Sequence, residues 1–223
     1  MTIATGIIAD IIGSRDLPDR AAAQQAILDS LARACEGAEV LRPVWPTVGD
    51  EFQLVVADPP TAVRVTGLAH LLLPATLSLR FGIGTGTVVE VGGSTTGSAP
   101  PIQDGSAWWA AREAIQTVHR LREGGQDAAL TWFRSGAPSS PGQAAWPEEE
   151  TVNALLLLRD HVIARMKSRE RRIATGLLAG STQVEIARSE GITQSAVSQN
   201  AHRSGAATLV EVHRLLASGE VRR

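Results

Sequence analysis

Apolar positions in the first 135 residues follow two periods, one typical of strands and one typical of helices. Residues 3–12 (IATGIIADII) are almost continuously apolar and β-branched, which predicts a central strand buried on both faces. Residues 16–37 carry apolar side chains at helical spacing and end at Gly37, which predicts a helix. The elements predicted in the same way are strands at 44–48 and 52–57, a helix at 61–73, a strand at 77–91, a helix at 107–123 and a short strand at 131–133.

This order, β-α-β-β-α-β-α-β, predicts an α+β sandwich in which helices cover one face of a mainly antiparallel sheet. The segment that follows is rich in proline, serine and glycine, which is typical of a linker. We therefore expect an α+β domain at residues 1–135, a linker at 136–148 and an all-α domain at 149–223. That domain begins with an apolar helix at 149–163, which we expect to pack on its own domain or on a second subunit.

Residues 183–202 (QVEIARSEGITQSAVSQNAH) fit the spacing of a helix-turn-helix. Such a motif needs a small residue where the second helix crosses the first, and Ala187 stands there. It favours glycine in the turn, where a left-handed backbone conformation is required, and Gly191 stands there. The positions that must be apolar to bury the helix pair are Ile186, Ile192 and Val197.

The helix-turn-helix predicts that the protein binds double-stranded DNA. Thr182 and Thr193 are expected to cap its two helices. The second helix would present polar side chains that suit base edges and phosphates: Gln194, Ser195, Ser198, Gln199, Asn200 and Arg203. The alternative is a helical hairpin that only docks on the first domain. Because such readers usually bind two symmetric half-sites, we expect a homodimer.

The net charge of −2 conceals an asymmetry between the two parts of the chain. Residues 1–150 carry 10 Arg against 17 Asp and Glu, a balance of −7; residues 151–223 carry 10 Arg and one Lys against 6 acidic residues, a balance of +5. Much of the positive charge lies at 165–172 (RMKSRERR) and at Arg188. A basic tail suits the DNA backbone, although an arginine-rich genome would give the same bias.

Cysteine content and hydropathy bear on the compartment. The single cysteine, Cys35, excludes an internal disulfide, which fits a reducing cytosol. No apolar run approaches the roughly 18 residues that cross a bilayer, and the N-terminus lacks the basic start of a signal peptide. We therefore expect a cytoplasmic protein without a membrane partner.

Two carboxylates in the first domain are candidates for metal binding. Asp10 ends the first buried strand, where a charge is costly unless it is paired or bound to a metal. Asp50 lies in the turn of the predicted hairpin, so the two converge if their strands are neighbours. Hard oxygen ligands of this kind suit Mg²⁺ together with phosphate oxygens. Glu51 follows Asp50 along the strand and is expected to point to the other face, paired with an arginine.

A phosphate group would find further partners close to Asp10. The backbone amides of Gly13, Ser14 and Arg15 come just before a predicted helix, where N–H groups bind anions. The guanidinium of Arg15 is also suited to pairing with a phosphate. These residues predict a phosphate cradle beside the carboxylates.

Several segments resemble the SatD family of bacterial proteins. They are ADIIGSRDLPDR (9–20), GDEFQ (49–53), LRFGIGTG (79–86) and DGSAWWAAREAI (104–115), together with the helix-turn-helix near the C-terminus. The resemblance spans most of the chain. It implies the two-part architecture but little chemistry.

More distantly, the first domain resembles class III nucleotidyl cyclases and the related GGDEF domains, whose fold is palm-like and ferredoxin-like. One metal-binding Asp of those families ends the first strand and another lies in a Gly-Asp hairpin. The resemblance therefore implies that Asp10, Asp50 and the backbone carbonyl of Ile11 hold Mg²⁺. It also implies nucleotide contacts from Arg80, in the glycine-bearing strand RFGIGTGTV, and from Arg112 on the following helix.

The sequence departs from active cyclases at three places. Pro46 stands near the position of an adenine-selecting Lys, and Trp108 or Trp109 replaces an Asn of the late helix. Val48 stands where GGDEF domains have their first Gly. The resemblance thus implies binding of a nucleoside triphosphate or another nucleotide with Mg²⁺, and leaves its turnover open.

Three functions are consistent with this sequence. The leading hypothesis is a DNA-binding transcriptional regulator whose cyclase-like domain senses a nucleotide or phosphate ligand with Mg²⁺. The alternative is a nucleotidyl cyclase or nucleotidyltransferase whose tail targets it to DNA. The third is a DNA-binding protein whose first domain serves only for dimerisation.

Overall fold

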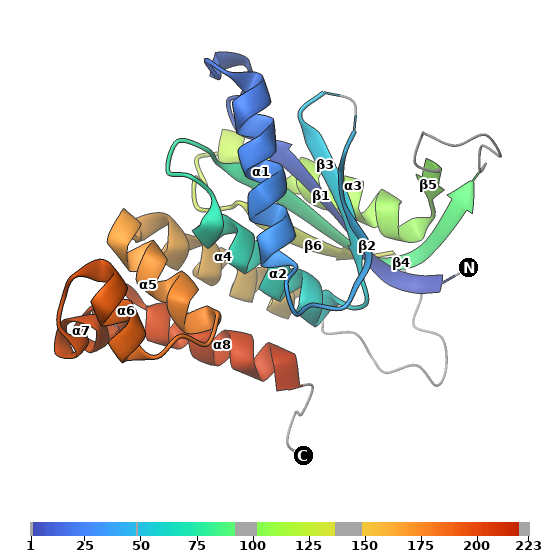
Figure 1. Ribbon diagram of the computed structural model, residues 1–223. Helices are drawn as coiled ribbons and strands as arrows, with labels where there is room; N and C mark the ends of the chain where they lie inside the picture. The colour runs from blue at the N-terminus through green and yellow to red at the C-terminus, as the bar shows by residue number, and fades with distance from the viewer. Residues whose placement is uncertain (1, 48, 92–101, 137–148, 219–223) are drawn as a thin grey trace.

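The computed structural model describes residues 2–47, 49–91, 102–136 and 149–218, with strands and helices mixed in the first part and helices alone in the second (Figure 1). The strands are β1 (Thr2–Ile11), β2 (Val40–Pro46), β3 (Glu51–Val56), β4 (Leu79–Val91), β5 (Ile102–Asp104) and β6 (Thr131–Ser135). The helices are α1 (Arg20–Ala34), α2 (Pro59–Leu72), α3 (Ser106–Glu123), α4 (Glu149–Arg165), α5 (Ser168–Leu178), α6 (Gln183–Glu190), α7 (Gln194–Ser204) and α8 (Ala206–Ser218), with a short 3-10 helix η1 (Ser14–Asp16). Most of the predicted linker lies outside the described residues.

The predicted order of elements in the first part is confirmed apart from one added strand, and some bounds differ: β2 spans Val40–Pro46 where 44–48 was predicted. A short strand, β5, lies within a segment predicted to be a loop. The first helix starts later than predicted because Asp19 caps it: its carboxylate accepts a hydrogen bond from the Ala22 amide at 2.9 Å. The α+β class is therefore shown, and the helices α4 to α8 follow as an all-helical region.

The sheet is mixed and mostly antiparallel. Its strands run in the order β2-β3-β1-β4-β5, and β6 joins β4 as the one parallel pair among the described strands. The longest strand, β4, pairs with β1 along ten positions, from Thr2 opposite Val88 to Ile11 opposite Leu79. In this register Asp10 lies opposite Glu51 on β3 and Arg80 on β4.

Helices cover both faces of the sheet, so the expectation that they cover a single face is wrong. On one face Ile7 and Phe81 belong to a large core with residues of α1 and α2. On the other face Ile8 packs with Trp108 and Ile115 of α3. In Figure 1, α1 and α2 lie in front of the sheet and α3 lies behind it.

Glycines on β4 allow α3 to approach the sheet closely. A Cβ atom at Gly82 would lie 2.2 Å from the carbonyl oxygen of Ala111, and one at Gly84 would lie 2.2 Å from that of Ala107. On β1, Gly6 leaves room for the ring of Trp108, which is only 7% exposed. The glycine-bearing strand thus serves helix packing rather than close approach of a ligand.

The outer edge of β6 is covered by α4. Asn153 pairs with the backbone of Phe133 on both sides: its Oδ1 accepts from the amide at 2.8 Å, and its Nδ2 donates to the carbonyl at 3.1 Å. Val152 and Leu156 of α4 belong to the main core. Because an unpaired strand edge invites pairing with other chains, α4 protects the sheet as well as extending its core.

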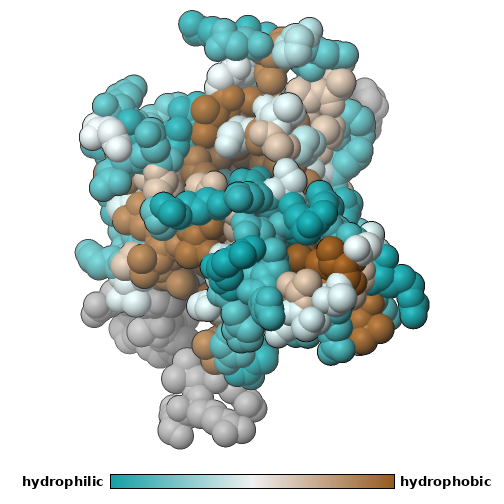
Figure 2. All heavy atoms as spheres, turned by 90° about the vertical axis from the view of Figure 1, so that its left-hand side faces the viewer, coloured by the Kyte–Doolittle hydropathy of each residue, from teal (hydrophilic) through white to brown (hydrophobic). Residues whose placement is uncertain are grey.

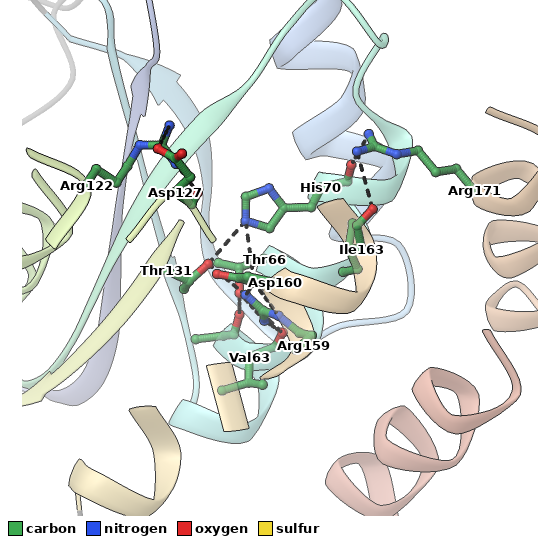
Figure 3. Close-up of polar contacts among 11 residues, drawn as sticks. Val63, Thr66, His70, Arg122, Asp127, Thr131, Arg159, Asp160, Ile163 and Arg171 are labelled. Atoms are coloured by element: carbon green, nitrogen blue, oxygen red, sulfur yellow. Dashed lines mark hydrogen bonds and ion pairs between the residues drawn. The ribbon is translucent and has the colours of Figure 1, made fainter. Parts of the chain in front are cut away.

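A buried polar cluster joins α4 to α2 and β6 (Figure 3). Arg159 contacts Asp160 Oδ1 through Nε at 2.9 Å and through Nη2 at 2.7 Å. The same guanidinium donates to the Val63 carbonyl at 2.7 Å, to Thr66 Oγ1 at 3.0 Å and to Thr131 Oγ1 at 2.7 Å. Every side chain of the cluster is buried, and the Arg159 guanidinium compensates the Asp160 charge through Oδ1, while Oδ2 has no partner within the described residues.

His70 completes this cluster. Its Nε2 lies 3.1 Å from Thr131 Oγ1 and 3.9 Å from Asp160 Oδ1. Burial lowers the pKa of His70 to about 4, against the pull of Asp160. The imidazole is therefore neutral at pH 7. The backbone carbonyl of His70 accepts a hydrogen bond from Arg171 of α5 at 3.2 Å, which connects the helical region to α2 (Figure 3).

The helical region has a core of its own. Ile173 of α5, Ile186 of α6, Val197 of α7 and Ala206 at the start of α8 are buried in it, and Leu71 of α2 contributes from the body. Within the described ranges, none of the helices combines the length and the hydropathy needed to cross a bilayer.

Candidate functional site

Charged side chains gather on the α3 face of the sheet, at the end where β1 stops. Asp10, Glu51 and Arg80 are direct cross-strand neighbours, and such neighbours share a face. From α3, Arg112 and His119, two turns apart, reach the same end. This end, at the top of Figure 1, includes the β2–β3 turn. The structure thus brings together the predicted residues Asp10, Arg80 and Arg112.

Asp10 is bound on one side by an arginine and a histidine. Its Oδ2 lies 2.6 Å from Arg80 Nη2 and 3.2 Å from His119 Nε2. Arg80 Nη1 lies 3.0 Å from His119 Nδ1, so a neutral imidazole that accepts at Nδ1 and donates at Nε2 satisfies both contacts. Burial raises the pKa of Asp10 and nearby Asp50 raises it further, while Arg80 and His119 oppose the shift. The ionised carboxylate is therefore only partly compensated.

Glu51 and Arg112 form the second pair of the cluster. Arg112 Nη2 lies 2.9 Å from Glu51 Oε1, and Nη1 contacts Oε2 in the same two-pronged arrangement. This hydrogen bonding raises the pKa of Arg112, and the charge of Asp10 adds to the shift. The pairing of Glu51 with an arginine agrees with expectation. Glu51 shares a face with Asp10, and its predicted orientation opposite Asp50 stays a prediction.

Asp50 approaches Asp10 from the turn before β3. Its carbonyl oxygen accepts from the Ile11 amide at 3.3 Å, and its charge acts on the pKa of Asp10. The described residues contain no group of three or more His, Cys, Asp or Glu side chains that could hold a metal ion. The donor set therefore does not fit a cage built by the protein alone. Mg²⁺ takes most of its ligands from phosphate and water, and its binding by Asp10 and Asp50 stays a prediction.

The predicted phosphate cradle is only partly arranged as expected. Gly13 adopts a left-handed conformation (φ 71°) and begins the single turn η1. However, α1 starts only at Arg20, and its own Asp19 occupies the N-terminal amide of Ala22, so these amides do not precede a long helix. Ser14 is half-buried, and Arg15 is exposed with no carboxylate partner among the described residues. Phosphate binding by residues 13–15 remains a prediction.

The predicted helix-turn-helix has its turn and both caps. Gly191 lies between α6 and α7 in a left-handed conformation (φ 64°). Thr182 Oγ1 accepts from the Glu185 amide at 3.2 Å, and Glu185 Oε2 accepts from the Thr182 amide at 2.7 Å, which completes a capping box. Thr193 Oγ1 accepts from the Ala196 amide at 3.2 Å at the start of α7. Thr182 and Thr193 thus stabilise the motif from within.

The two sides of α7 differ in polarity. Val197 and Ala201 are buried against the neighbouring helices. The exposed residues are Gln194, Ser195, Gln199, His202 and Arg203, and Ser198 is half-buried. Asn200 is half-buried as well, and its Oδ1 is buried without a partner within the described ranges. Figure 2 shows this side of the molecule, where hydrophilic residues surround smaller hydrophobic patches.

Some arginines of the predicted basic surface are engaged in contacts within the protein. Arg171 donates to the carbonyls of His70 and Ile163, and burial lowers the pKa of its guanidinium. Arg172 forms a two-pronged pair with Glu190, at 2.7 Å for both contacts. Positive charge at this end therefore comes from exposed residues such as Arg188, and from Arg203, which is exposed and lies 3.9 Å from Glu170.

The fold and the site together define a class of protein. It has a mixed α+β body joined to a helix-turn-helix, and carboxylates and arginines gather at one end of its sheet. The chain belongs to the SatD family, whose family model matches residues 4–212. This confirms the resemblance seen in the sequence. A search of the curated proteins gave no match to the chain.

Solved structures of cyclases share parts of the fold. One is described as a bacterial light-regulated adenylyl cyclase (TM-score 0.43, 16% identity, 54% of this chain and 72% of that chain), and a second structure of such a cyclase gives 0.45, 15%, 54% and 41%. The adenylyl cyclase CyaB from P. aeruginosa gives a TM-score of 0.37 and 17% identity over 54% of this chain and 81% of that chain.

Sequence reasoning missed one member of the carboxylate cluster and undervalued another. His119 was not singled out, although it falls two turns after Arg112 on the same side of a predicted helix. Glu51 was assigned to the face opposite Asp50. A check of which helix positions lie seven residues from a candidate arginine would have found His119.

Proposed function

We propose that the protein is a DNA-binding transcriptional regulator. The observation that carries the proposal is the capped helix-turn-helix, whose second helix, α7, exposes Gln194, Gln199 and Arg203 while burying Val197. In this proposal residues 149–223 are the DNA-binding part, 136–148 the linker, and 1–135 the part that senses a ligand.

The chemistry of α7 suits the major groove. The groove is wide enough for one helix, and glutamine amides pair with base edges there while arginine neutralises phosphate. The positive balance of residues 151–223 favours an anionic partner, despite the internal pairing of Arg172. Two copies on neighbouring half-sites would place two α7 helices about one DNA turn apart, so the proposal includes a homodimer.

The DNA proposal is tested with the full chain and a pool of randomised 30-bp duplexes. Rounds of selection at low salt should enrich a sequence, and affinity for it should fall steeply as salt rises, because each phosphate contact releases counterions. Sedimentation of the complex counts the protein copies for each duplex, with two expected. Failure to retain any duplex at low salt would overturn the proposal.

A matched pair of glutamine variants locates the contact. Gln199→Ala removes an exposed amide from α7, and we expect affinity for the selected duplex to fall about tenfold or more, since one two-pronged base contact contributes about 1–3 kcal/mol. Gln24→Ala makes the same change at an exposed position of α1 and should bind like the unaltered protein. Equal affinities for the two variants would show that α7 does not read the DNA.

A second candidate function is binding of a nucleotide with Mg²⁺ at Asp10 and Asp50, with or without turnover. It is favoured by the mutual repulsion of the two carboxylates, which a divalent cation would relieve. Here the site is a sensor if the nucleotide only binds, and a nucleotidyl cyclase or nucleotidyltransferase if it reacts. The test incubates the protein with each NTP and Mg²⁺ or Mn²⁺, and follows product by chromatography and melting temperature in parallel.

The variants Asp10→Asn and Asp50→Asn should abolish any shift in melting temperature that NTP and Mg²⁺ produce. Burial raises the pKa of Asp10 above 3.8, so the protonated carboxyl is the form that favours the fold. This contribution to the free energy of unfolding is complete below pH 3.8 and is lost as pH rises through the raised pKa, so ionised Asp10 lowers stability. Asp10→Asn should therefore be no less stable than the unaltered protein at pH 7, which separates lost binding from misfolding. A ligand shift that survives in both variants would place the nucleotide elsewhere.

A further inference from the structure

A cavity of about 310 Å³ lies between the body and the helices that surround the helix-turn-helix. Its lining comes from the end of α1, from α2, from α5 and from α8. This volume is at the lower end of the range for small-molecule sites. A ligand there would touch elements that belong to both parts of the chain.

Two arginines line the cavity, and neither forms an ion pair within the described residues. Arg64 of α2 is half-buried, and its contact among the described residues is Nε donating to His213 Nε2 at 3.2 Å. Burial, and then the charge of Arg64, lower the pKa of His213 to about 4, so the imidazole is a neutral acceptor at pH 7. Arg33 of α1 is exposed at the same cavity and has no ion-pair partner within the described ranges. By contrast, Arg80, Arg112 and Arg159 each bind a carboxylate.

The remaining lining limits the size and character of a ligand. Leu68 and Leu178 line this cavity and also a smaller one of about 30 Å³, which continues between α2 and α8. Glu36 is exposed and is the one acidic residue in the described lining. Arg64 is half-buried, whereas Glu36 is exposed and forms no ion pair with it among the described contacts.

We propose that this cavity is a binding site for a small molecule bearing a carboxylate or phosphate group, which Arg64 and Arg33 hold between α1–α2 and α5–α8. Guanidinium groups bind both anions through parallel hydrogen bonds, and Nη1 and Nη2 of Arg64 are not engaged in the described contacts. The apolar walls formed by Leu68 and Leu178 cover the rest of the ligand. The site is separate from the Asp10 cluster, which lies on the α3 face of the sheet.

Its position gives the ligand a route to the DNA-binding helices. Thr175 of α5 lines the cavity, and the neighbouring Ile173 and Ala174 belong to the core that holds α6 and α7. A ligand that favours one spacing of α2 and α5 would bias the placement of α7. This consequence rests on the proposed DNA binding, whereas the anion site itself does not.

The site is tested with inorganic phosphate and citrate, at constant ionic strength, by the melting temperature of the full chain. Either anion, at about five times its Kd, should raise the melting temperature by about 2–4 °C, and the anion that acts distinguishes a phosphate from a carboxylate ligand. Arg64→Gln should remove the shift, and Arg33→Gln should reduce it. Arg20→Gln is the matched control, because Arg20 is likewise exposed on α1 but lies at its opposite end.

Two results would overturn the anion site. One is no shift with either anion; the other is a shift that persists unchanged in both Arg64→Gln and Arg33→Gln, which would place the anion elsewhere. Arg33 is exposed, so its variant is expected to fold even if Arg64→Gln does not. DNA affinity is measured separately in buffer free of both anions. Loss of DNA binding there contradicts the proposed function alone, and an absent anion shift contradicts the cavity site alone.

Discussion

Two clusters of the same three residue types behave differently in this protein. Asp10, Arg80 and His119 meet at the open end of the sheet, where the His119 side chain is 41% exposed. Asp160, Arg159 and His70 meet beneath α4, where none of the three is more than 5% exposed. The residue types are the same in both clusters, so solvent exposure is what distinguishes the candidate binding site from the buried contact between α4 and the body.

The two clusters also come from different parts of the fold. The open cluster draws on adjacent strands and α3, all within the body. The sealed cluster links α2, β6 and α4, and the backbone of His70 extends the link to Arg171 of α5. Solvent reaches the open cluster, whereas the sealed cluster can change only if α4 moves. Polar residues there hold the two parts in one arrangement.

The largest expected effect comes from breaking the sealed pair. Arg159→Met leaves Asp160 buried and uncompensated, so we expect the free energy of unfolding to fall by about 3–5 kcal/mol, measured in urea. Arg169→Met, which removes an exposed arginine 3.7 Å from Glu190, should cost less than about 1 kcal/mol. The double variant Arg159→Met with Asp160→Leu should recover most of the loss. A change below about 1 kcal/mol for Arg159→Met alone would show that the pair is not what holds α4.

A smaller effect is expected from acid. Because the pKa of His70 is lowered to about 4 in the fold, its stabilising contribution is complete above the unfolded pKa of 6.5 and is lost as pH falls towards 4. Between pH 7 and pH 5 we expect a loss of roughly 2 kcal/mol from this residue. In His70→Gln the dependence on pH over this range should shrink, leaving the share of His213, whose pKa is also lowered to about 4. An unchanged dependence in His70→Gln would contradict the burial of a neutral imidazole.

The smallest effect is expected at the open cluster. Arg112→Ala removes the partner of Glu51, but the Arg112 side chain is 47% exposed and solvent screens the pair. We expect a loss of about 0.2–1 kcal/mol, by the same urea measurement, together with weaker retention of any anionic ligand bound at this end. A loss as large as that of Arg159→Met would mean that the open cluster is structural too.

Local signals predicted more of this molecule than non-local ones. The helix-turn-helix depends on neighbours within twenty residues, and its turn at Gly191 and its caps at Thr182 and Thr193 are present. The order of strands and helices also followed from apolar periodicity. By contrast, periodicity does not say which face of a sheet a helix will cover, so the position of α3 was missed.

The candidate site shows the same limit. Asp10 was identified because a charge at the end of a buried strand needs a partner, yet its partners Arg80 and His119 depend on strand register and on α3. Asn200 was assigned to the exposed side of α7 by residue type alone, and its Oδ1 is buried. Residue types indicated the chemistry, whereas the contacts depended on tertiary packing.

The amide of Asn153 has a consequence for how the two parts of this chain could be exchanged during evolution. Since this side chain pairs with both backbone groups of Phe133, a helical part transferred to another protein from Glu149 onward would leave β6 with an open edge. The donor body would then be prone to pair with copies of itself. Recombination that keeps α4 with the sheet would avoid this, so α4 should travel with the body in any functional exchange.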